Sequence, residues 1–273
     1  MTLHEDITLS NGVVVPRLAL GVFRAGAGPG TRDAVLAALR AGYRHVDTAS
    51  IYRNEVEVGE AIRASGLARR DVFVTTKLWN DDHGYDAALT AFETSRSRLG
   101  LDYVDLYLVH WPVPGDRAAT WRALEEILAS GRCRAIGVSN FMPRHLDDLL
   151  RSARVPPAVN QIELHPFLPQ RELVERCRRD GIVVAAYSAL TKGRRLSDER
   201  LVAAAARLGV SPAQLLIAWS LQKGNVVVAK SASTSRIEEN WIARRLALDA
   251  STITQLDALD DGSRTAWDPT GVE

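Results

Sequence analysis

The chain has 273 residues and a mass of 29.9 kDa, and 46% of its residues are hydrophobic, which suits one globular domain over residues 1–273. Its 34 Lys and Arg residues nearly balance 33 Asp and Glu residues, so the net charge of +1 argues against a nucleic-acid or membrane-surface partner. No run approaches the roughly 18 apolar residues of a membrane-spanning helix, the acidic start MTLHEDI does not resemble a signal peptide, and only two cysteines occur, so we expect a cytoplasmic protein.

The first predicted element is a small hairpin, ITLSNGVVV, which turns at Asn11-Gly12. After it, short apolar and β-branched runs alternate with segments whose apolar residues recur at helical spacing. The runs predicted as strands are 17–20, 45–48, 72–77, 104–110, 135–139, 158–162, 183–187 and 226–230. Helical patterns between them include 32–42, 54–66, 85–100 and 117–131, each ending in glycine, which helix C-termini prefer.

Eight strand signals, each followed by a helix, predict an α/β fold of the closed parallel (β/α)₈ TIM-barrel type, typically of about 250 residues. The extra length fits the hairpin, a helix near the C-terminus and two helices before the eighth strand, at 197–209 and 211–224. The alternative is a doubly wound open sheet with a Rossmann site, which requires G-x-G-x-x-G. The nearest candidate, residues 26–31, contains Pro29 and has Thr31 in place of the last glycine, so we interpret it as a loop.

Three neighbouring predicted strands end in charged or titratable residues, namely Asp47, Lys77 and His110. Only four of the 34 cationic residues are lysines, so a lysine at the end of an apolar strand requires a chemical reason. Functional residues of such barrels lie at the C-terminal ends of the strands. Burial of a charge there is costly unless the charge is paired or used.

These three residues, with Tyr52 five positions after Asp47, form a candidate active site. Each has a structural interpretation by itself: a turn-forming Asp, a rim Tyr, a hydrogen-bonded His, and a Lys that only pairs with the Asp. Together they suit carbonyl reduction, because an ammonium near Tyr52 would lower the pKa of a phenol that is otherwise a poor acid. Asp47 would keep Lys77 charged, His110 would orient the carbonyl oxygen, and Tyr52 would donate a proton to it.

A phosphate site is predicted after the eighth strand. Lys230 and Ser231 precede a helical pattern in which Arg236 and Asn240 lie four residues apart, on one face. A lysine, a hydroxyl and an arginine near a helix N-terminus suit a phosphomonoester such as the 2′-phosphate of NADP. The alternative is a solvated, charged start of a helix.

Three stretches carry a family resemblance: GYRHVDTASIYRNEVEVGEAI (42–62), VDLYLVHWP (104–112) with GVSNF (137–141), and VVVAKSASTSRIEEN (226–240). In these and in the segments between them the chain resembles the aldo-keto reductase family, particularly its compact bacterial members. The resemblance implies a TIM-barrel monomer that uses NADP(H) to reduce the aldehyde or ketone group of a small molecule. Small aldehydes, 2-oxoaldehydes and keto-sugar acids such as 2,5-diketo-D-gluconate are the expected substrates.

The resemblance also implies roles for individual residues. Tyr52 is the proton donor, assisted by Asp47, Lys77 and His110. The cofactor positions are Gly21, Ser139, Asn140, Gln161, Tyr187, Ser188, Leu190, Lys192, Lys230, Ser231, Arg236 and Asn240, with Lys192 expected near the pyrophosphate. The substrate positions are Val22, Trp79, His110 and Trp111.

Departures from the family pattern bear on binding. Ala189 and Ala229 stand where members commonly have proline, beside cofactor positions, so we expect a looser backbone there. The loop after Pro112 and the tail after Trp267 are short, which favours an open pocket.

Two other classes of function fit part of this pattern. An aldolase would use Lys77 for a Schiff base, against which the paired Asp47 counts. Potassium-channel β subunits resemble the same family and act mainly as binding partners. The sequence predicts no metal site, because Asp81-Asp82-His83 reads as a polar loop and His165 as a structural residue.

Overall fold

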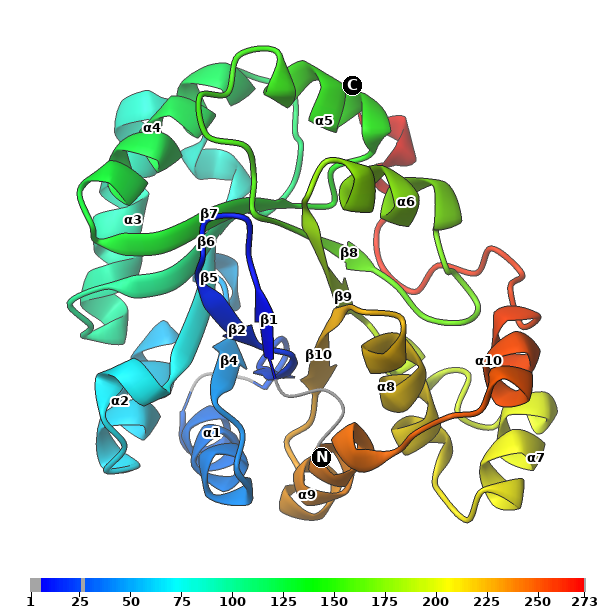
Figure 1. The fold of residues 1–273 in the computed structure, drawn as a ribbon. Helices are drawn as coiled ribbons and strands as arrows, with labels where there is room; N and C mark the ends of the chain where they lie inside the picture. The colour runs from blue at the N-terminus through cyan, green and yellow to red at the C-terminus, as the bar shows by residue number, and fades with distance from the viewer. Residues whose placement is uncertain (1–5, 26–27, 273) are drawn as a thin grey trace.

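The structure is a computed structural model that describes residues 6–25 and 28–272. Eight parallel strands form a closed barrel, with helices packed around its outside (Figure 1). The barrel strands are β3 (Leu18–Gly21), β4 (His45–Asp47), β5 (Phe73–Leu78), β6 (Val104–Val109), β7 (Cys133–Ser139), β8 (Val159–Glu163), β9 (Val183–Tyr187) and β10 (Val226–Lys230). They are neighbours in this order, and β10 closes the barrel by pairing with both β3 and β9. The predicted (β/α)₈ barrel is therefore confirmed.

A hairpin covers one end of the barrel. Its strands β1 (Asp6–Thr8) and β2 (Val14–Pro16) pair antiparallel, and Gly12 turns the chain between them with a φ of 84°. Leu9 and Val15 of the hairpin are buried against inward-facing side chains such as Leu106, where the strands begin. Because this end of the barrel is filled, the opposite end, where the strands finish, is the one available for a site.

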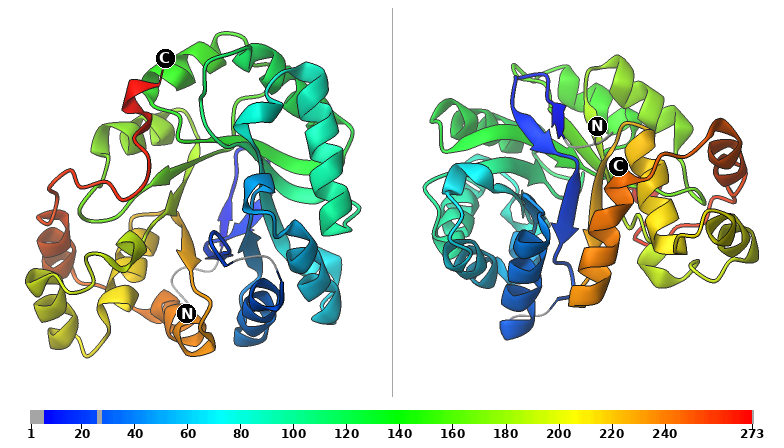
Figure 2. Two further views of the ribbon diagram at one scale, coloured as in Figure 1. Left: turned by 180° about the vertical axis from the view of Figure 1, so that it is seen from behind. Right: turned by 60° about the horizontal axis from the view of Figure 1, so that its bottom comes forward.

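Ten helices occur in the described chain: α1 (Pro29–Ala41), α2 (Glu55–Ala64), α3 (Tyr85–Leu99), α4 (Arg117–Ala129), α5 (Pro143–Leu150), α6 (Arg171–Arg179), α7 (Glu199–Arg207), α8 (Pro212–Gln222), α9 (Thr234–Ile242) and α10 (Ala250–Asp257). The two helices predicted before the last strand are α7 and α8. The Ser211 side chain caps α8 by accepting a hydrogen bond from the Gln214 backbone amide, and the Gln214 side chain accepts one from the Ser211 backbone amide. The tail after α10 runs to α5 (red in Figure 2), where Val272 contacts His145 at 2.8 Å.

Predicted strand ends differ from the observed ones by one or two residues. Thr48 and His110 lie just beyond β4 and β6, although their amides still donate to carbonyls of the neighbouring strand β5, to Thr75 O at 2.8 Å and Leu78 O at 3.1 Å. The loop interpretation of residues 26–31 is wrong from Pro29 onward: α1 begins at Pro29, with Gly28 at the N-cap and a φ of 98°, because proline suits the first helical position. Gly26 and Ala27 lie outside the described residues.

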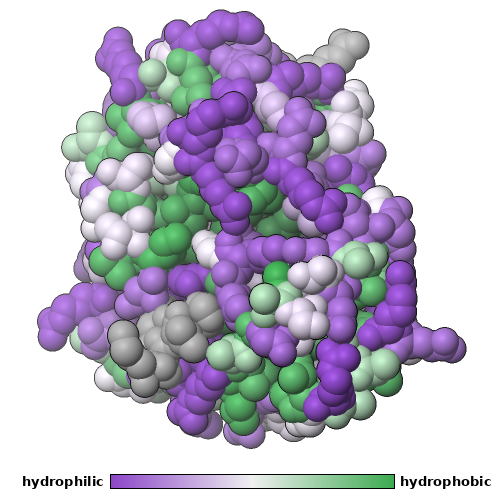
Figure 3. All heavy atoms as spheres, turned by 45° about the vertical axis from the view of Figure 1, so that its right-hand side comes forward, coloured by the Kyte–Doolittle hydropathy of each residue, from purple (hydrophilic) through white to green (hydrophobic). Residues whose placement is uncertain are grey.

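Figure 3 shows one face on which hydrophilic side chains predominate and smaller hydrophobic areas lie between them. No single helix of the described chain is long and apolar enough to cross a membrane. Helices α7 and α8 pass that test only as a pair, bent by 83° at the break between them.

Candidate active site

A buried ion pair lies at the C-terminal ends of β4 and β5. The Lys77 ammonium donates hydrogen bonds to Asp47 Oδ1 at 2.6 Å and to the Thr48 carbonyl at 2.7 Å. The other carboxylate oxygen, Asp47 Oδ2, accepts from Gln161 Nε2 at 2.7 Å. Lys77 is fully buried and Asp47 is 3% exposed. Burial lowers the pKa of Lys77 below its ordinary value, and the adjacent Asp47 offsets part of that shift because it stabilises the charged ammonium.

Tyr52 lies beside this pair on a short 3₁₀ turn, η1 (Ser50–Tyr52). The turn is fixed by a hydrogen bond from Ser50 Oγ to the Lys77 carbonyl at 3.0 Å. The centre of the Tyr52 ring is 5.2 Å from Lys77 Nζ and 5.8 Å from the centre of the His110 ring, with the two rings edge to face. The structure thus brings Tyr52 together with the three residues that the sequence places at strand ends.

The prediction that Lys77 makes Tyr52 more acidic is wrong for this structure. Burial raises the pKa of the Tyr52 phenol well above its usual value, and the negative charge of Asp47 raises it further. The Lys77 ammonium donates to Asp47 and Thr48, so the carboxylate offsets its charge at the phenol. Tyr52 therefore holds its proton at neutral pH, which a proton donor must do before the reaction.

His110 follows β6 and is neutral. Burial lowers the pKa of its imidazole well below the usual value, and the nearby Lys77 charge acts in the same direction. Trp79 packs edge to face on this ring at 5.3 Å, and Trp111 stacks beside it at 6.5 Å. Its Nδ1 is buried without a hydrogen-bond partner among the described residues. A neutral imidazole held by two indoles can orient an oxygen atom without adding charge to the pocket.

Polar side chains from β7, β8 and β9 form a second cluster next to Asp47. Tyr187 donates to Asn140 Oδ1 at 2.7 Å, and Asn140 Nδ2 donates to the His110 carbonyl at 3.0 Å. Ser139 Oγ donates to the Gln161 carbonyl at 2.8 Å. Asn140 has a φ of 64°, a left-handed conformation that asparagine tolerates. These four predicted cofactor positions are therefore fixed by one another and, through Gln161, by Asp47.

The predicted phosphate positions lie on β10 and α9. Lys230 and Arg236 are exposed, whereas Ser231 and Asn240 are buried. Ser231 Oγ accepts from the Ser233 amide at 3.2 Å and thereby shapes the turn into α9. Two exposed cations near the start of a helix form a fitting cradle for a phosphate group, because the helix N-terminus also favours negative charge.

Backbone positions next to this cradle are determined by packing. Gly21 pairs with Lys230 in the barrel, and a Cβ on Gly21 would lie 2.9 Å from a methyl carbon of Val228. Ala189 and Ala229, which replace the expected prolines, are both buried, and Ala229 pairs with Leu20 in the barrel. The looser backbone expected at Ala229 is thus restrained by the strand pairing on its β3 side.

Lys192 contacts the tail of the chain in this structure. It lies in a 3₁₀ turn after β9, η4 (Thr191–Gly193), and has a φ of 51°. Ser188, just before this turn, has a φ of 50°, and Leu190 is half-buried. The Lys192 ammonium donates to the Thr265 carbonyl at 2.6 Å, so the contact that the structure shows is to the tail and not to the predicted pyrophosphate position.

The sequence analysis missed two residues of the site, Glu163 and Trp267, and both are involved in contacts of the tail. Glu163, the last residue of β8, accepts hydrogen bonds from the Thr265 amide at 2.7 Å, from the Ala266 amide at 3.0 Å and from the Thr265 hydroxyl. This fixes Trp267 with its ring 4.6 Å from that of Trp111. Glu163 gives the same signal as Asp47, an acidic residue at a strand end, and could have been found by it.

The loop after β3 contributes a further missed residue. Phe23 is 42% exposed, and its ring lies 5.0 Å from that of Tyr52. The neighbouring Val22, predicted as a pocket residue, is 1% exposed, and its carbonyl accepts from Asn54 Nδ2 at 3.0 Å. Phe23 therefore lines the entrance to Tyr52, whereas Val22 holds the backbone in place.

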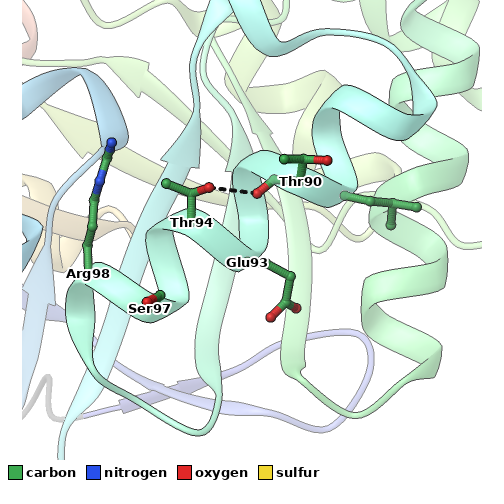
Figure 4. Close-up of a pocket in the computed structure, with 6 residues that line it drawn as sticks. Thr90, Glu93, Thr94, Ser97 and Arg98 are labelled. Carbon is green, nitrogen blue, oxygen red and sulfur yellow. Dashed lines mark hydrogen bonds between the residues drawn. The ribbon is translucent and has the colours of Figure 1, made fainter.

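Other features of the described chain lie away from this cluster. No set of His, Cys, Asp and Glu that could hold a metal ion occurs within residues 6–25 and 28–272. His165, predicted as structural, contacts Glu163 with its Nε2 at 3.2 Å. A separate surface hollow runs along α3 and is lined by Leu89, Thr90, Glu93, Thr94, Ser97 and Arg98 (Figure 4).

Comparisons with known proteins show which family the chain belongs to. A model of the Aldo/keto reductase family matches residues 17–261. An aldo-keto reductase of Mycolicibacterium smegmatis is 48% identical over 98% of both chains, and the glyoxal reductase of Bacillus subtilis is 44% identical over 98% of this chain and 97% of that one. The crystal structure of a Bombyx mori aldo-keto reductase in complex with NADP has a TM-score of 0.89 and 34% identity, covering 96% of this chain and 94% of that one. The chain therefore belongs to the aldo/keto reductase family, as the resemblance predicted.

Proposed function

We propose that the protein reduces an aldehyde or ketone group of a small molecule to an alcohol, with NADPH as the cofactor. The observation that carries the proposal is the position of Tyr52, a phenol that holds its proton, beside a buried Lys77–Asp47 pair and a neutral His110. The silkworm relative was solved with NADP, which supports the choice of cofactor. When bound, NADPH supplies the hydride for the carbonyl carbon.

The residues of the site then have distinct tasks. Tyr52 donates its proton to the carbonyl oxygen as negative charge develops there, and His110 hydrogen-bonds the same oxygen and fixes its direction. Lys77 stabilises the phenolate that Tyr52 becomes. Asp47 keeps Lys77 protonated and, with the Thr48 carbonyl, holds its ammonium in place.

The cofactor residues divide into two groups. Asn140, Gln161 and Tyr187 form a polar cluster next to Asp47, where a nicotinamide would have to lie for transfer near Tyr52. Lys230, at the end of β10, and Arg236, in the first turn of α9, present two exposed cations, which suits the 2′-phosphate that distinguishes NADPH from NADH.

The substrates that fit best are small aldehydes and 2-oxoaldehydes, with keto-sugar acids such as 2,5-diketo-D-gluconate as a further class. One relative is named a glyoxal reductase, which supports the 2-oxoaldehydes. Trp79, Trp111 and Trp267 supply indole surfaces near His110, so a carbonyl compound with a flat or apolar substituent also has a surface to contact.

The test is a panel of carbonyl compounds followed by the loss of nicotinamide absorbance with NADPH and with NADH. The wild-type protein should turn over at least one small aldehyde, and Tyr52→Phe should lose most of that rate while it still binds NADPH. Tyr85→Phe is the matched control, because it removes a phenol hydroxyl from an exposed site on α3. Undiminished reduction by Tyr52→Phe would contradict the assigned role.

Borohydride trapping and the carbonyl panel together separate the other classes of function. A Schiff-base aldolase would be trapped on Lys77 by borohydride in the presence of its substrate, but the ammonium already donates to Asp47 and Thr48. A protein that acts only as a binding partner would show no turnover with any compound of the panel.

We further infer that residues 1–273 act as one domain, because the eight strands close into a single barrel, and we expect that domain to act as a monomer. A cytoplasmic location suits the two cysteines, Cys133 and Cys177, which are both buried and unpaired.

A further inference from the structure

A second carboxylate lies behind the strand that carries Lys77. Glu55 is 1% exposed and is the first residue of α2, three positions after Tyr52. Its Oε1 accepts a hydrogen bond from Thr76 Oγ1 at 2.6 Å. Successive side chains of a strand point to opposite faces, so Thr76 faces the helices while Lys77 faces the barrel interior. Glu55 is therefore bonded to the residue adjacent to Lys77, from the outer side of β5.

Few groups compensate this buried charge directly. The nearest cation is Arg98 at the end of α3, whose Nη1 is 3.9 Å from Glu55 Oε2. Figure 4 shows Arg98 extending from the helix in the direction opposite to Glu93. Oε2 itself is buried and makes no well-formed hydrogen bond among the described residues; the buried Ser95 hydroxyl beside it lowers the pKa of the Glu55 carboxyl, but by less than burial raises it. A buried carboxylate that is only partly satisfied costs stability, so stabilisation alone does not explain an acid at this position.

Glu55 also connects the two elements of the candidate active site. The chain runs from Tyr52 through Asn54, the N-cap of α2, directly into Glu55. Asn54 accepts from Thr48 Oγ1 at 2.8 Å and donates to the Val22 carbonyl at 3.0 Å, so this segment is rigid. The bond from Thr76 to Glu55 then fastens the segment to β5, which fixes the distance between Tyr52 and Lys77.

We propose that Glu55 is a positioning residue for carbonyl reduction: it ties the Tyr52 segment to the Lys77 strand through Thr76, and its negative charge acts on Lys77 through the strand. This inference rests on the proposed function. Burial raises the pKa of the Glu55 carboxyl above its ordinary value, whereas Thr76, Ser95, Arg98 and the helix N-terminus favour the charged form. The charge of Glu55 in turn raises the pKa of Lys77, in the same direction as Asp47 and against burial.

Other charged and titratable groups act on the same residues and are present in every variant below. Those that face Lys77 are Asp47 and His45 on β4, Tyr52 on η1, and His110 after β6. Those that face Glu55 are Arg98 on α3, Lys77 on β5, and Tyr107 on β6.

The experiment compares pH profiles of carbonyl reduction for three variants. Glu55→Gln keeps an oxygen that Thr76 can bond to but removes the charge, so Lys77 should lose its proton more easily. The alkaline limb of kcat should move to lower pH by about half a unit or more. Glu55→Asp keeps the charge but shortens the side chain, so kcat should fall about tenfold with the limb unmoved. Glu60→Gln removes an exposed charge from the same helix and should change neither property.

The binding of NADPH, followed by fluorescence, should stay within about twofold in all three variants, because Glu55 lies outside the barrel wall. Circular dichroism and thermal unfolding establish that each variant is folded. Should Glu55→Gln fail to fold, Glu55→Asp still tests the link that the Thr76–Glu55 hydrogen bond makes between the two segments. A wild-type kcat for Glu55→Asp would overturn the proposal.

Tyr52→Phe is measured alongside, so that the two proposals can fail separately. An inactive Tyr52→Phe together with a wild-type pH profile for Glu55→Gln would overturn the role of Glu55 alone. A fully active Tyr52→Phe would overturn the proposed function, and the role of Glu55 with it.

Discussion

The two sides of the barrel mouth are built in different ways. On what we term the catalytic side, Asp47, Lys77 and Gln161 come from three strands, are buried, and bond to one another across the barrel. On the phosphate side, defined by Lys230 and Arg236, both cations are exposed. The difference indicates that the barrel arranges the proton-transfer groups before a ligand arrives, whereas the phosphate side supplies charges that a ligand would order.

The strongest test of this comparison is Asp47→Asn. The substitution leaves Lys77 buried without its counter-ion, so the lysine should lose its proton at neutral pH and kcat should fall about a hundredfold or more. NADPH binding should change far less, because the phosphate side is untouched. Steady-state kinetics and fluorescence titration measure the two effects. Asp102→Asn, at an exposed position, is the matched control. Equal losses in kcat and in cofactor binding would show that the two sides are not independent.

A smaller effect is expected from Arg236→Ala on the phosphate side. Losing one exposed cation should raise the KM for NADPH about tenfold and leave the KM for NADH nearly unchanged, because only NADPH carries the 2′-phosphate. The kcat with saturating NADPH should remain close to wild type. Arg40→Ala removes an exposed arginine from α1 and serves as the control. If NADH binding weakens as much as NADPH binding, Arg236 does not contact the 2′-phosphate.

What the sequence could predict follows the same division. The alternation of strand and helix patterns was sufficient for the barrel, and charged residues at apolar strand ends were sufficient to locate Asp47 and Lys77. The direction in which the pKa of Tyr52 shifts could not be predicted, because it depends on whether the effect of burial on the phenol is larger than the effect of the Lys77 ammonium. The partner of Lys192 was not accessible either, because the Thr265 carbonyl lies 73 residues further along the chain and no pattern in the sequence joins them.

Lys192 gives the next test, because sequence and structure lead to opposite expectations. In the structure its ammonium fastens the tail, and the tail places Trp267 against Trp111. Lys192→Met should therefore raise the KM for an aromatic aldehyde several-fold and change NADPH binding by less than about twofold. Lys223→Met, which removes a lysine paired with Asp257 elsewhere, should change neither. Weaker NADPH binding with an unchanged aldehyde KM would restore the pyrophosphate contact that the sequence predicted.

The smallest effect concerns the stability of the tail at low pH. Hydrogen bonds from His165, Thr265 and Ala266 outweigh burial and hold the pKa of Glu163 at about 2, below its ordinary value of 4.5. A lowered pKa in the folded state means that the stabilisation is complete above pH 4.5 and is lost as the pH falls toward 2. Thermal unfolding should therefore show Glu163→Gln a few degrees less stable than wild type near pH 7, with the gap closing in that acid range. A gap that stays constant down to pH 2 would mean that the Glu163 carboxylate is not what fastens the tail, and that Lys192 and the Trp111–Trp267 contact suffice to hold it.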